Sequence, residues 1–198
     1  PQVTVDDESV ASLAAAEVYA VDADGRDLLV LVGDFQAGDA VGQYRVAEAF
    51  LDVAEAFGAA EIIALGGAPT GEMVEEYTVV GAVTDAAQRD RFADAGVEFR
   101  ENEPAGGIVG TSGLLLGLGA RRGLPAACLM GETSGYLVDP SSAQAVLEVL
   151  QGMLGFSVDF GTLEERAEEL QEVISEFQEQ HGGGMEAAPA DEDLRYIG

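Results

Sequence analysis

The side chains able to support covalent chemistry are few in this sequence. His181 is the only histidine, Cys128 is the only cysteine, and all nine basic residues are arginine. A Ser–His–Asp set, a Cys–His pair or a histidine-based metal site therefore cannot be assembled in the core. A nucleotide-binding P-loop is excluded as well, because its pattern requires a lysine. We predict no catalytic residues, no metal and no cofactor.

The glycine-rich segment GGIVGTSGLLLGLGARRG, residues 106–123, allows two interpretations. Glycines before a helix can expose backbone amides that bind an anion. However, the dinucleotide spacing G-x-G-x-x-G is absent, and Glu101, Glu103 and Glu132 would repel an anion. The alternative is that glycines on the helix allow close packing against a sheet or another helix; these are Gly110, Gly113, Gly117 and Gly119. We favour packing, with anion binding as a secondary role.

Three polar, glycine-bearing loops follow predicted strands, at residues 33–39, 66–72 and 131–136. Open α/β sheets bind ligands at the carboxyl ends of their strands. These loops and the glycine-rich segment therefore predict a possible ligand pocket, formed by Gly71, Glu72, Gly107, Gly110, Glu132, Thr133 and Ser134. The alternative is that these loops are only connections, which any α/β sheet produces, and we favour that alternative narrowly.

Short apolar runs alternate with amphipathic stretches, which predicts an α/β fold with a mostly parallel sheet and helices on both faces. Residues 16–34 predict two strands joined by a turn at Asp24–Gly25. Further strands are expected at residues 61–67, 78–85, 97–100 (an edge strand) and 125–132. Helices are expected at residues 42–58, 85–96, 110–123 and 139–155. Their predicted starts include Thr111 or Ser112, and Asp139 followed by Pro140. The first helix is expected to bury Tyr44, Val46, Ala47, Phe50, Leu51, Ala54 and Phe57.

The end of the chain has a different composition. We expect an α/β domain at residues 1–161, a closing helix at 162–181 and a flexible tail at 182–198. Thr162 and Glu165 fit a capping box at the start of this helix. The tail is rich in glycine and acidic residues, which favours mobility. It ends in LRYIG, an apolar and aromatic tip suited to binding a partner.

The net charge of −28, from 37 acidic and nine basic residues, is far from that of an average protein. Such charge keeps proteins soluble in concentrated salt, so we predict a halophilic protein that loosens in low salt. The acidity argues against binding nucleic acid. One cysteine excludes an intrachain disulfide, and no apolar run reaches the length of a membrane span. We therefore expect a cytoplasmic protein without a membrane partner.

Several segments together resemble the proteasome assembly chaperone family, its type-two members and their archaeal relatives. They are GDFQAGDAVGQYRVAEAFLDVAEAFG, LGGAPTGE, GAVTD and the long stretch from GVEFRENEP through GGIVGTSGLLLGL to CLMGETSGYLVDP. The resemblance extends from about residue 27 to about residue 180. It implies a homo-oligomeric three-layer α/β fold similar to nucleoside phosphorylases. Archaeal members are thought to promote assembly of the core proteasome, some by binding the α-ring through a C-terminal tail.

The sequence departs from this family in two places. Family members begin with a further glycine-rich strand–helix unit resembling GxPGxG, which we expect to be missing here because the chain starts at Pro1. The docking tail of the family ends in a hydrophobic residue, tyrosine and any residue, whereas Tyr196 is third from the end.

The resemblance predicts a non-catalytic assembly chaperone or interaction protein that binds proteasome α-subunits and itself. The predicted partner-binding residues are Leu194, Tyr196, Ile197 and Gly198. The alternative is a small-ligand-binding or nucleoside-processing enzyme of phosphorylase-like fold, which would use the loop pocket.

Overall fold

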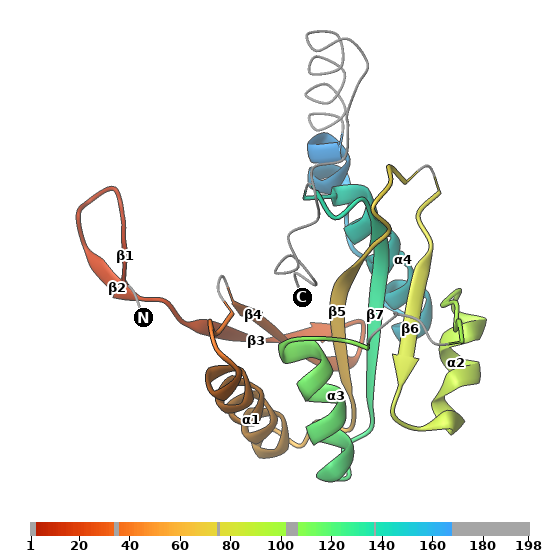
Figure 1. Ribbon diagram of the computed structural model, residues 1–198, viewed down its shortest axis with the longest axis horizontal. Helices are drawn as coiled ribbons and strands as arrows, with labels where there is room; N and C mark the ends of the chain where they lie inside the picture. Colours follow the sequence, from red (N-terminus) through yellow and green to blue (C-terminus); the bar gives the residue numbers. More distant parts are fainter. Residues whose placement is uncertain (1–2, 34–35, 75, 102–106, 137, 168–198) are drawn as a thin grey trace, which may run out of the picture.

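Strand β7 (Ala126–Thr133) is the centre of a three-stranded sheet. The computed structural model describes residues 3–33, 36–74, 76–101, 107–136 and 138–167. β7 pairs in parallel with β5 (Ile62–Pro69) and antiparallel with β6 (Val79–Val83), so the order is β5-β7-β6 (Figure 1). The first six residues of β7 are all buried. This continuous burial requires that both faces of the strand are covered.

Alternate residues of β7 contribute to two separate cores. Ala127 and Leu129 belong to a cluster with Val146 and Leu150 of helix α4 (Pro140–Leu154). Phe92 of helix α2 (Arg89–Asp94) belongs to the same cluster, as do Val79 and Val97. A short 3-10 helix, η1 (Ala86–Gln88), precedes α2. The start of α4 confirms the sequence prediction: Asp139 accepts a hydrogen bond from the Ser142 amide at 3.1 Å, and Pro140 is the first helical residue.

The opposite face of the sheet is covered by helix α3 (Thr111–Arg121). Leu116 of α3 lies in a cluster with Ala64, Val80 and the β7 residues Ala126, Cys128 and Met130. Helix α1 (Ala40–Ala56) packs on α3, and Asp39 caps it by accepting from the Gly42 amide at 2.7 Å. The helices thus lie on both faces of the sheet (Figure 1).

The predicted buried stripe of α1 is only partly correct. Ala47 and Leu51 are fully buried, whereas Tyr44 and Phe57 are exposed. Because α1 contacts chiefly α3, only one narrow line of its surface is covered in the described chain.

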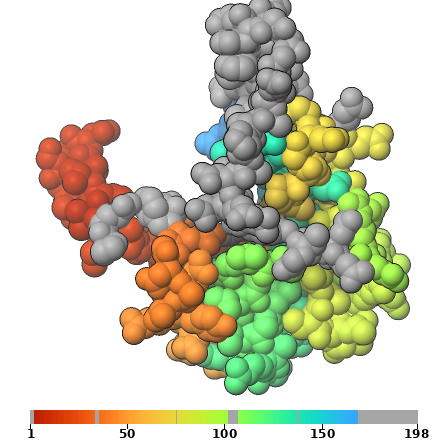
Figure 2. Space-filling model, in the orientation of Figure 1, coloured from red at the N-terminus to blue at the C-terminus, as the bar shows by residue number. Residues whose placement is uncertain are grey.

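The N-terminal arm, residues 3–33, contains four strands outside the main sheet. β1 (Val3–Val5) pairs with β2 (Ala11–Leu13), and β3 (Ala16–Ala23) pairs with β4 (Arg26–Gly33). Asp24 and Gly25 both have positive φ, as a two-residue hairpin turn requires, which confirms the predicted hairpin. β1 and β2 project away from the helices and the main sheet (Figures 1 and 2). No residue of this arm is buried.

The prediction of a mostly parallel sheet is wrong for the residues that the structure describes. β1–β2, β3–β4 and β6–β7 are antiparallel, whereas β5–β7 is parallel. The two-residue turn forces β3 and β4 to be antiparallel. No crossover helix separates β5 from β6, so β6 returns in the opposite direction. The predicted edge strand at residues 97–100 is reduced to one parallel bridge, Val80–Glu98.

Residues 161–167 are helical, and this is the described part of the predicted closing helix. The predicted capping box is wrong, because Thr162 lies inside the helix. The amides of Leu163 and Glu164 donate instead to the carbonyl of Phe160, at 2.8 and 2.9 Å. The rest of this helix and the tail at 182–198 lie outside the described residues. None of the described helices combines the length and the hydropathy that a membrane-spanning helix needs.

Candidate functional site

Two of the three predicted loops meet at the carboxyl ends of β5 and β7. The parallel register places Ala68 beside Glu132 and Pro69 beside Thr133. Beyond the strands, the Thr70 amide donates to the Thr133 carbonyl at 2.8 Å. The Tyr136 hydroxyl donates to the Gly71 carbonyl at 3.4 Å. The parallel pairing of β5 with β7 therefore brings Gly71 and Glu72 close to Thr133 and Ser134.

Glu132 is ion-paired rather than free. Arg100 Nη1 lies 2.6 Å from its Oε1, and Arg100 Nη2 lies 2.9 Å from Glu98 Oε2. The Glu132 side chain is largely buried, so this charge-assisted pair offsets the cost of its desolvation. Sequence reasoning treated Glu132 as a residue that repels anions and did not identify Arg100. The composition held one signal: because carboxylates greatly outnumber the nine arginines, each arginine is expected to pair with a carboxylate. The composition does not indicate which carboxylate.

Thr133 has an enclosed hydroxyl at the same edge. Its Oγ1 is buried, and among the described residues it has no hydrogen-bond partner. Its methyl group approaches Gly67, where an added Cβ would lie 3.1 Å from Thr133 Cγ2. Ser134, the next residue, is buried and accepts a long hydrogen bond of 3.4 Å from the Tyr136 amide. This edge thus holds two hydroxyls between the two loops.

The third predicted loop reaches a different place, the start of α3. An added Cβ at Gly110 would lie 3.2 Å from Gln36 Oε1, so Gln36 of this loop approaches the start of α3. In Figure 1, α3 begins below the carboxyl ends of β5 and β7. Gly110 therefore lies beside Gln36 at the start of α3, whereas Gly71, Glu72, Thr133 and Ser134 lie at the carboxyl ends of β5 and β7.

The start of α3 differs in detail from the prediction. Gly110, with φ of 85°, is the N-cap residue, whereas Thr111 and Ser112 are already helical and buried. The prediction that Thr111 or Ser112 lies near the cap is therefore confirmed, although the cap residue itself is Gly110. A glycine is favoured at the cap because this backbone conformation strains any other residue.

The packing interpretation of the α3 glycines holds at individual positions. A Cβ at Gly113 would clash with the carbonyl oxygen of Ile108, and one at Gly119 would lie 3.3 Å from the Leu124 carbonyl oxygen. Gly117 faces open space, so the prediction of close packing at Gly117 is wrong. The helix therefore depends on glycine at specific positions rather than along its length.

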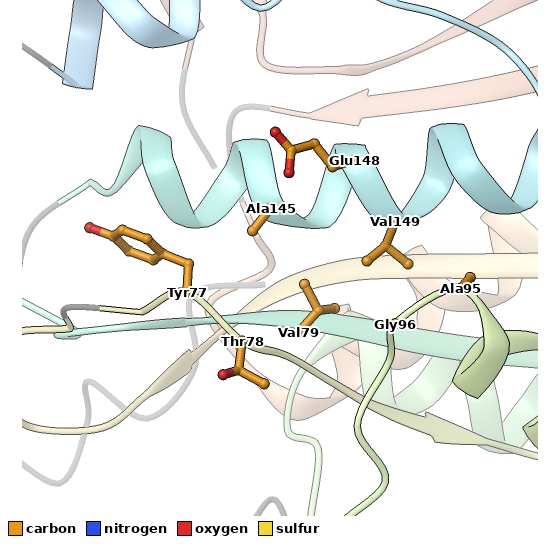
Figure 3. A pocket seen from close by; sticks show the side chains of 8 residues that line it. All are labelled: Tyr77, Thr78, Val79, Ala95, Gly96, Ala145, Glu148 and Val149. Carbon is orange, nitrogen blue, oxygen red and sulfur yellow. The ribbon is translucent and has the colours of Figure 1, made fainter.

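A cavity of about 400 Å³ lies on the α4 side of the sheet. Val79, Ala145 and Val149 point toward one another across it, and Tyr77 lies at one end (Figure 3). Burial and the negative charge of Asp139 raise the pKa of Tyr77, so the phenol stays neutral. The complete lining is Tyr77, Thr78, Val79, Ala95, Gly96, Ala145, Glu148 and Val149. The cavity is open, and its lining combines the polar residues Tyr77, Thr78 and Glu148 with small apolar ones.

The described residues do not form a reactive cysteine or a cluster of metal-binding side chains. Cys128 is buried in the sheet, and burial raises its pKa to about 12, so it is not a nucleophile at neutral pH. No group of three or more histidine, cysteine or acidic side chains in the described part of the chain is arranged to hold a metal ion. The predicted tip residues Leu194, Tyr196, Ile197 and Gly198 lie outside the described residues.

The fold and these loops define an α/β protein with a mixed sheet between helices and a polar loop edge. Residues 1–178 match the model of the PAC2 family. An uncharacterized protein of Methanocaldococcus jannaschii is 38% identical over the whole chain, which covers 77% of that protein. The chain belongs to the PAC2 family.

Solved structures agree with this assignment. The structure of Pyrococcus furiosus PbaB, described as an archaeal proteasome activator, is similar with a TM-score of 0.80 and 36% identity. The match covers 89% of this chain and 77% of PbaB. Pyrococcus furiosus PbaA, described as an archaeal homolog of proteasome-assembly chaperone, gives a TM-score of 0.75 and 25% identity over 91% of this chain and 71% of PbaA.

Proposed function

We propose that this protein is a non-catalytic factor that binds the core proteasome and promotes its assembly or activity. The single observation that carries the proposal is the similarity to PbaB, at 36% identity over 89% of the chain. The site agrees with this function, because Glu132 is held by Arg100 and Cys128 is buried as a neutral thiol. These side chains suit a folded scaffold better than a reaction centre.

The finer parts of the proposal concern partners and architecture. We expect the α-subunits of the core proteasome to be the binding partners, and Leu194, Tyr196, Ile197 and Gly198 to contact them. A terminal carboxylate beside an aromatic and an apolar side chain matches a known mode of C-terminal recognition. We also expect self-association, a three-layer arrangement like that of nucleoside phosphorylases, and a cytoplasmic location.

Binding to the purified core proteasome in molar KCl tests this function. The full-length protein is expected to co-sediment with the core particle, and deletion of residues 194–198 is expected to weaken binding at least tenfold. A matched control replaces Leu163, near the start of the closing helix, with alanine and is expected to bind normally. Binding that survives the deletion, together with a lower melting temperature, would show that the tail is structural. Absence of any binding by the native protein would contradict the proposed function.

One observation supports the small-ligand alternative: Thr133 Oγ1 is buried between two loops and has no hydrogen-bond partner in the described part of the chain. A ligand at that edge would protect the fold from heat in proportion to its occupancy. Melting temperatures measured with nucleosides and inorganic phosphate distinguish the alternatives. A rise that Thr133→Val abolishes would favour the ligand site, and unchanged melting would favour the scaffold.

A further inference from the structure

Helix α3 begins without a side chain that caps it. An aspartate accepts a backbone amide at the start of each of α1, η1 and α4, whereas Gly110, the N-cap residue of α3, has no side chain to do so. The first amide that bonds within α3 is that of Leu114, which donates to the Gly110 carbonyl at 3.1 Å. The amides of Thr111, Ser112 and Gly113 therefore have no acceptor in the described part of the chain.

Two hydroxyl groups in the first turn of α3 are also unpaired. Thr111 and Ser112 are only 9% and 8% exposed, and neither hydroxyl has a hydrogen-bond partner among the described residues. Polar groups as buried as these are normally hydrogen-bonded. The fully enclosed polar side-chain atoms that lack a partner in the described chain belong to Gln88 and Thr133, so the Thr111 and Ser112 hydroxyls keep access to a ligand. These hydroxyls therefore add two unused donors beside the free amides.

The loop before α1 brings a further polar group to the same place. Arg122, at the end of α3, lies 2.7 Å from Asp52 and 3.3 Å from Glu55 in the second half of α1. The two helices pack side by side in the same direction (Figure 1), so their starts are neighbours. An added Cβ at Gly110 would lie 3.2 Å from Gln36 Oε1. Because rotation of the carboxamide exchanges its oxygen and nitrogen, Gln36 can present an N–H group to a ligand there.

The charges along this segment favour an anion. Residues 107–131 contain no acidic residue, although the whole chain has 37. Glu132, which the sequence analysis expected to repel an anion, is paired with Arg100. The N-terminus of an α-helix carries a partial positive charge, and its free amides are directed toward a bound anion. Because the donors are neutral amides and hydroxyls, they suit one small oxyanion rather than a polyphosphate.

We propose that the start of α3 binds a small oxyanion, which is a phosphate or a carboxylate group. The anion accepts hydrogen bonds from the amides of Thr111, Ser112 and Gly113 and from the two hydroxyls, with the Gln36 side chain beside it. Glycine is required at position 110, because its φ of 85° strains any other residue. The inference is independent of the proposed proteasome binding, because no residue of the C-terminal tail takes part.

Amide signals in nitrogen-15 NMR spectra of the full chain test this site directly. Potassium phosphate or potassium acetate is added at constant ionic strength to the protein in molar KCl. The signals of Thr111, Ser112 and Gly113 are expected to shift and to reach saturation with at least one of the two anions. Saturation with phosphate alone assigns the site to phosphate groups, and saturation with acetate alone assigns it to carboxylates. Shifts that stay linear with both anions would overturn the proposal.

Removal of each hydroxyl separates a built site from a general effect of salt. Thr111→Val and Ser112→Ala are each expected to weaken the affinity about tenfold, because each loses a hydrogen bond to a charged group. Ser142→Ala is the matched control, since Ser142 is equally buried in the first turn of α4, whose start Asp139 already caps. This control is expected to keep the native affinity. Equal affinities in all three variants would contradict the site.

A substitution in the exposed loop tests the site without altering the buried turn of α3. Gln36 is exposed, and Gln36→Glu places a carboxylate beside the helix start, where it repels an incoming anion and competes with it for the free amides. This variant is expected to lose the saturable shifts. Val138→Glu adds the same charge at an 89% exposed site and is expected to keep them. A Gln36→Glu variant that binds the anion as tightly as the native protein would overturn the proposal.

Discussion

At the scale of single residues, glycines in α3 differ sharply in what they do. Gly113 leaves room for the carbonyl oxygen of Ile108, whereas Gly117 faces open space on the same helix. Gly113→Ala is expected to lower the free energy of unfolding by about 1–3 kcal/mol, because the added carbon overpacks against backbone. Denaturant unfolding in molar KCl measures this change.

Gly117→Ala is the matched control for that substitution. It adds the same methyl group to the same helix without a clash, so the better helix propensity of alanine is expected to stabilise the protein by up to ~1 kcal/mol. Equal effects of the two substitutions would contradict a packing role for Gly113.

The burial of Cys128 predicts that the stability of the protein depends on pH. Burial raises its pKa to about 12 from 9.0, so the thiol ionises in the unfolded chain before it ionises in the folded one. The neutral thiol therefore contributes its full stabilisation of the folded protein below pH 9. This contribution is lost as the pH rises toward 12, by up to ~1.4 kcal/mol per pH unit. The stability difference between the native protein and Cys128→Ala is therefore expected to narrow above pH 9. Chemical unfolding from pH 8 to pH 11 measures this difference in the free energy of unfolding. A difference that stays constant over this range would contradict the raised pKa of Cys128.

At the scale of elements, the start of α4 is governed by one cap. Asp139 accepts from the Ser142 amide at 3.1 Å. Asp139→Ala is expected to lower the free energy of unfolding by about 1 kcal/mol. Asp139→Asn keeps an acceptor and is expected to lose much less. Thermal unfolding of the two variants compares them, and equal losses would show that the cap is not the cause.

Local signals predicted the elements well, and long-range contacts account for the failures. The turn at Asp24–Gly25, the α4 cap and the continuous apolar run of β7 are encoded within a few residues, and the structure confirms them. The direction of β6 depends on its pairing with a strand much later in the chain. Burial of Tyr44 and Phe57 depends on how much of α1 its neighbours cover. Neither property is present in the local pattern.

The candidate site shows the same difference between local signals, which the sequence reveals, and long-range contacts, which it does not. Strand ends correctly located Gly71 and Thr133 on adjacent loops, because β5 and β7 are parallel neighbours. The position of the loop at residues 33–39 depended on the packing of α1 against α3. Arg100 was missed because nothing within its own segment indicates Glu132 as its partner.

At the scale of the whole molecule, the net charge of −28 is expected to control how stability depends on salt. Some carboxylates are paired: Arg122 Nη1 lies 2.7 Å from Asp52 Oδ1, and Arg91 pairs with Glu61. However, the 37 acidic residues greatly outnumber the nine arginines. Repulsion among the remaining carboxylates favours expansion, and salt screens it. The melting temperature is therefore expected to rise steadily as KCl increases from millimolar to molar concentration.

A neutral osmolyte separates screening from a general effect of solutes. Sucrose at matched osmolality is excluded from protein surfaces but does not screen charge. It is expected to raise the melting temperature much less than KCl. A melting temperature that is independent of KCl would show that the acidic surface does not control stability.

The central position of β7 has a consequence for the order in which the chain folds. The β3–β4 hairpin closes through a two-residue turn, so it can form in microseconds as soon as its residues exist. The sheet cannot form in this way, because β5 and β6 are each bonded to β7 rather than to one another. Closing these distant pairings carries a loop entropy that slows folding. During synthesis the hairpin can therefore form transiently before the ribosome delivers β7, the strand that joins the two halves of the sheet.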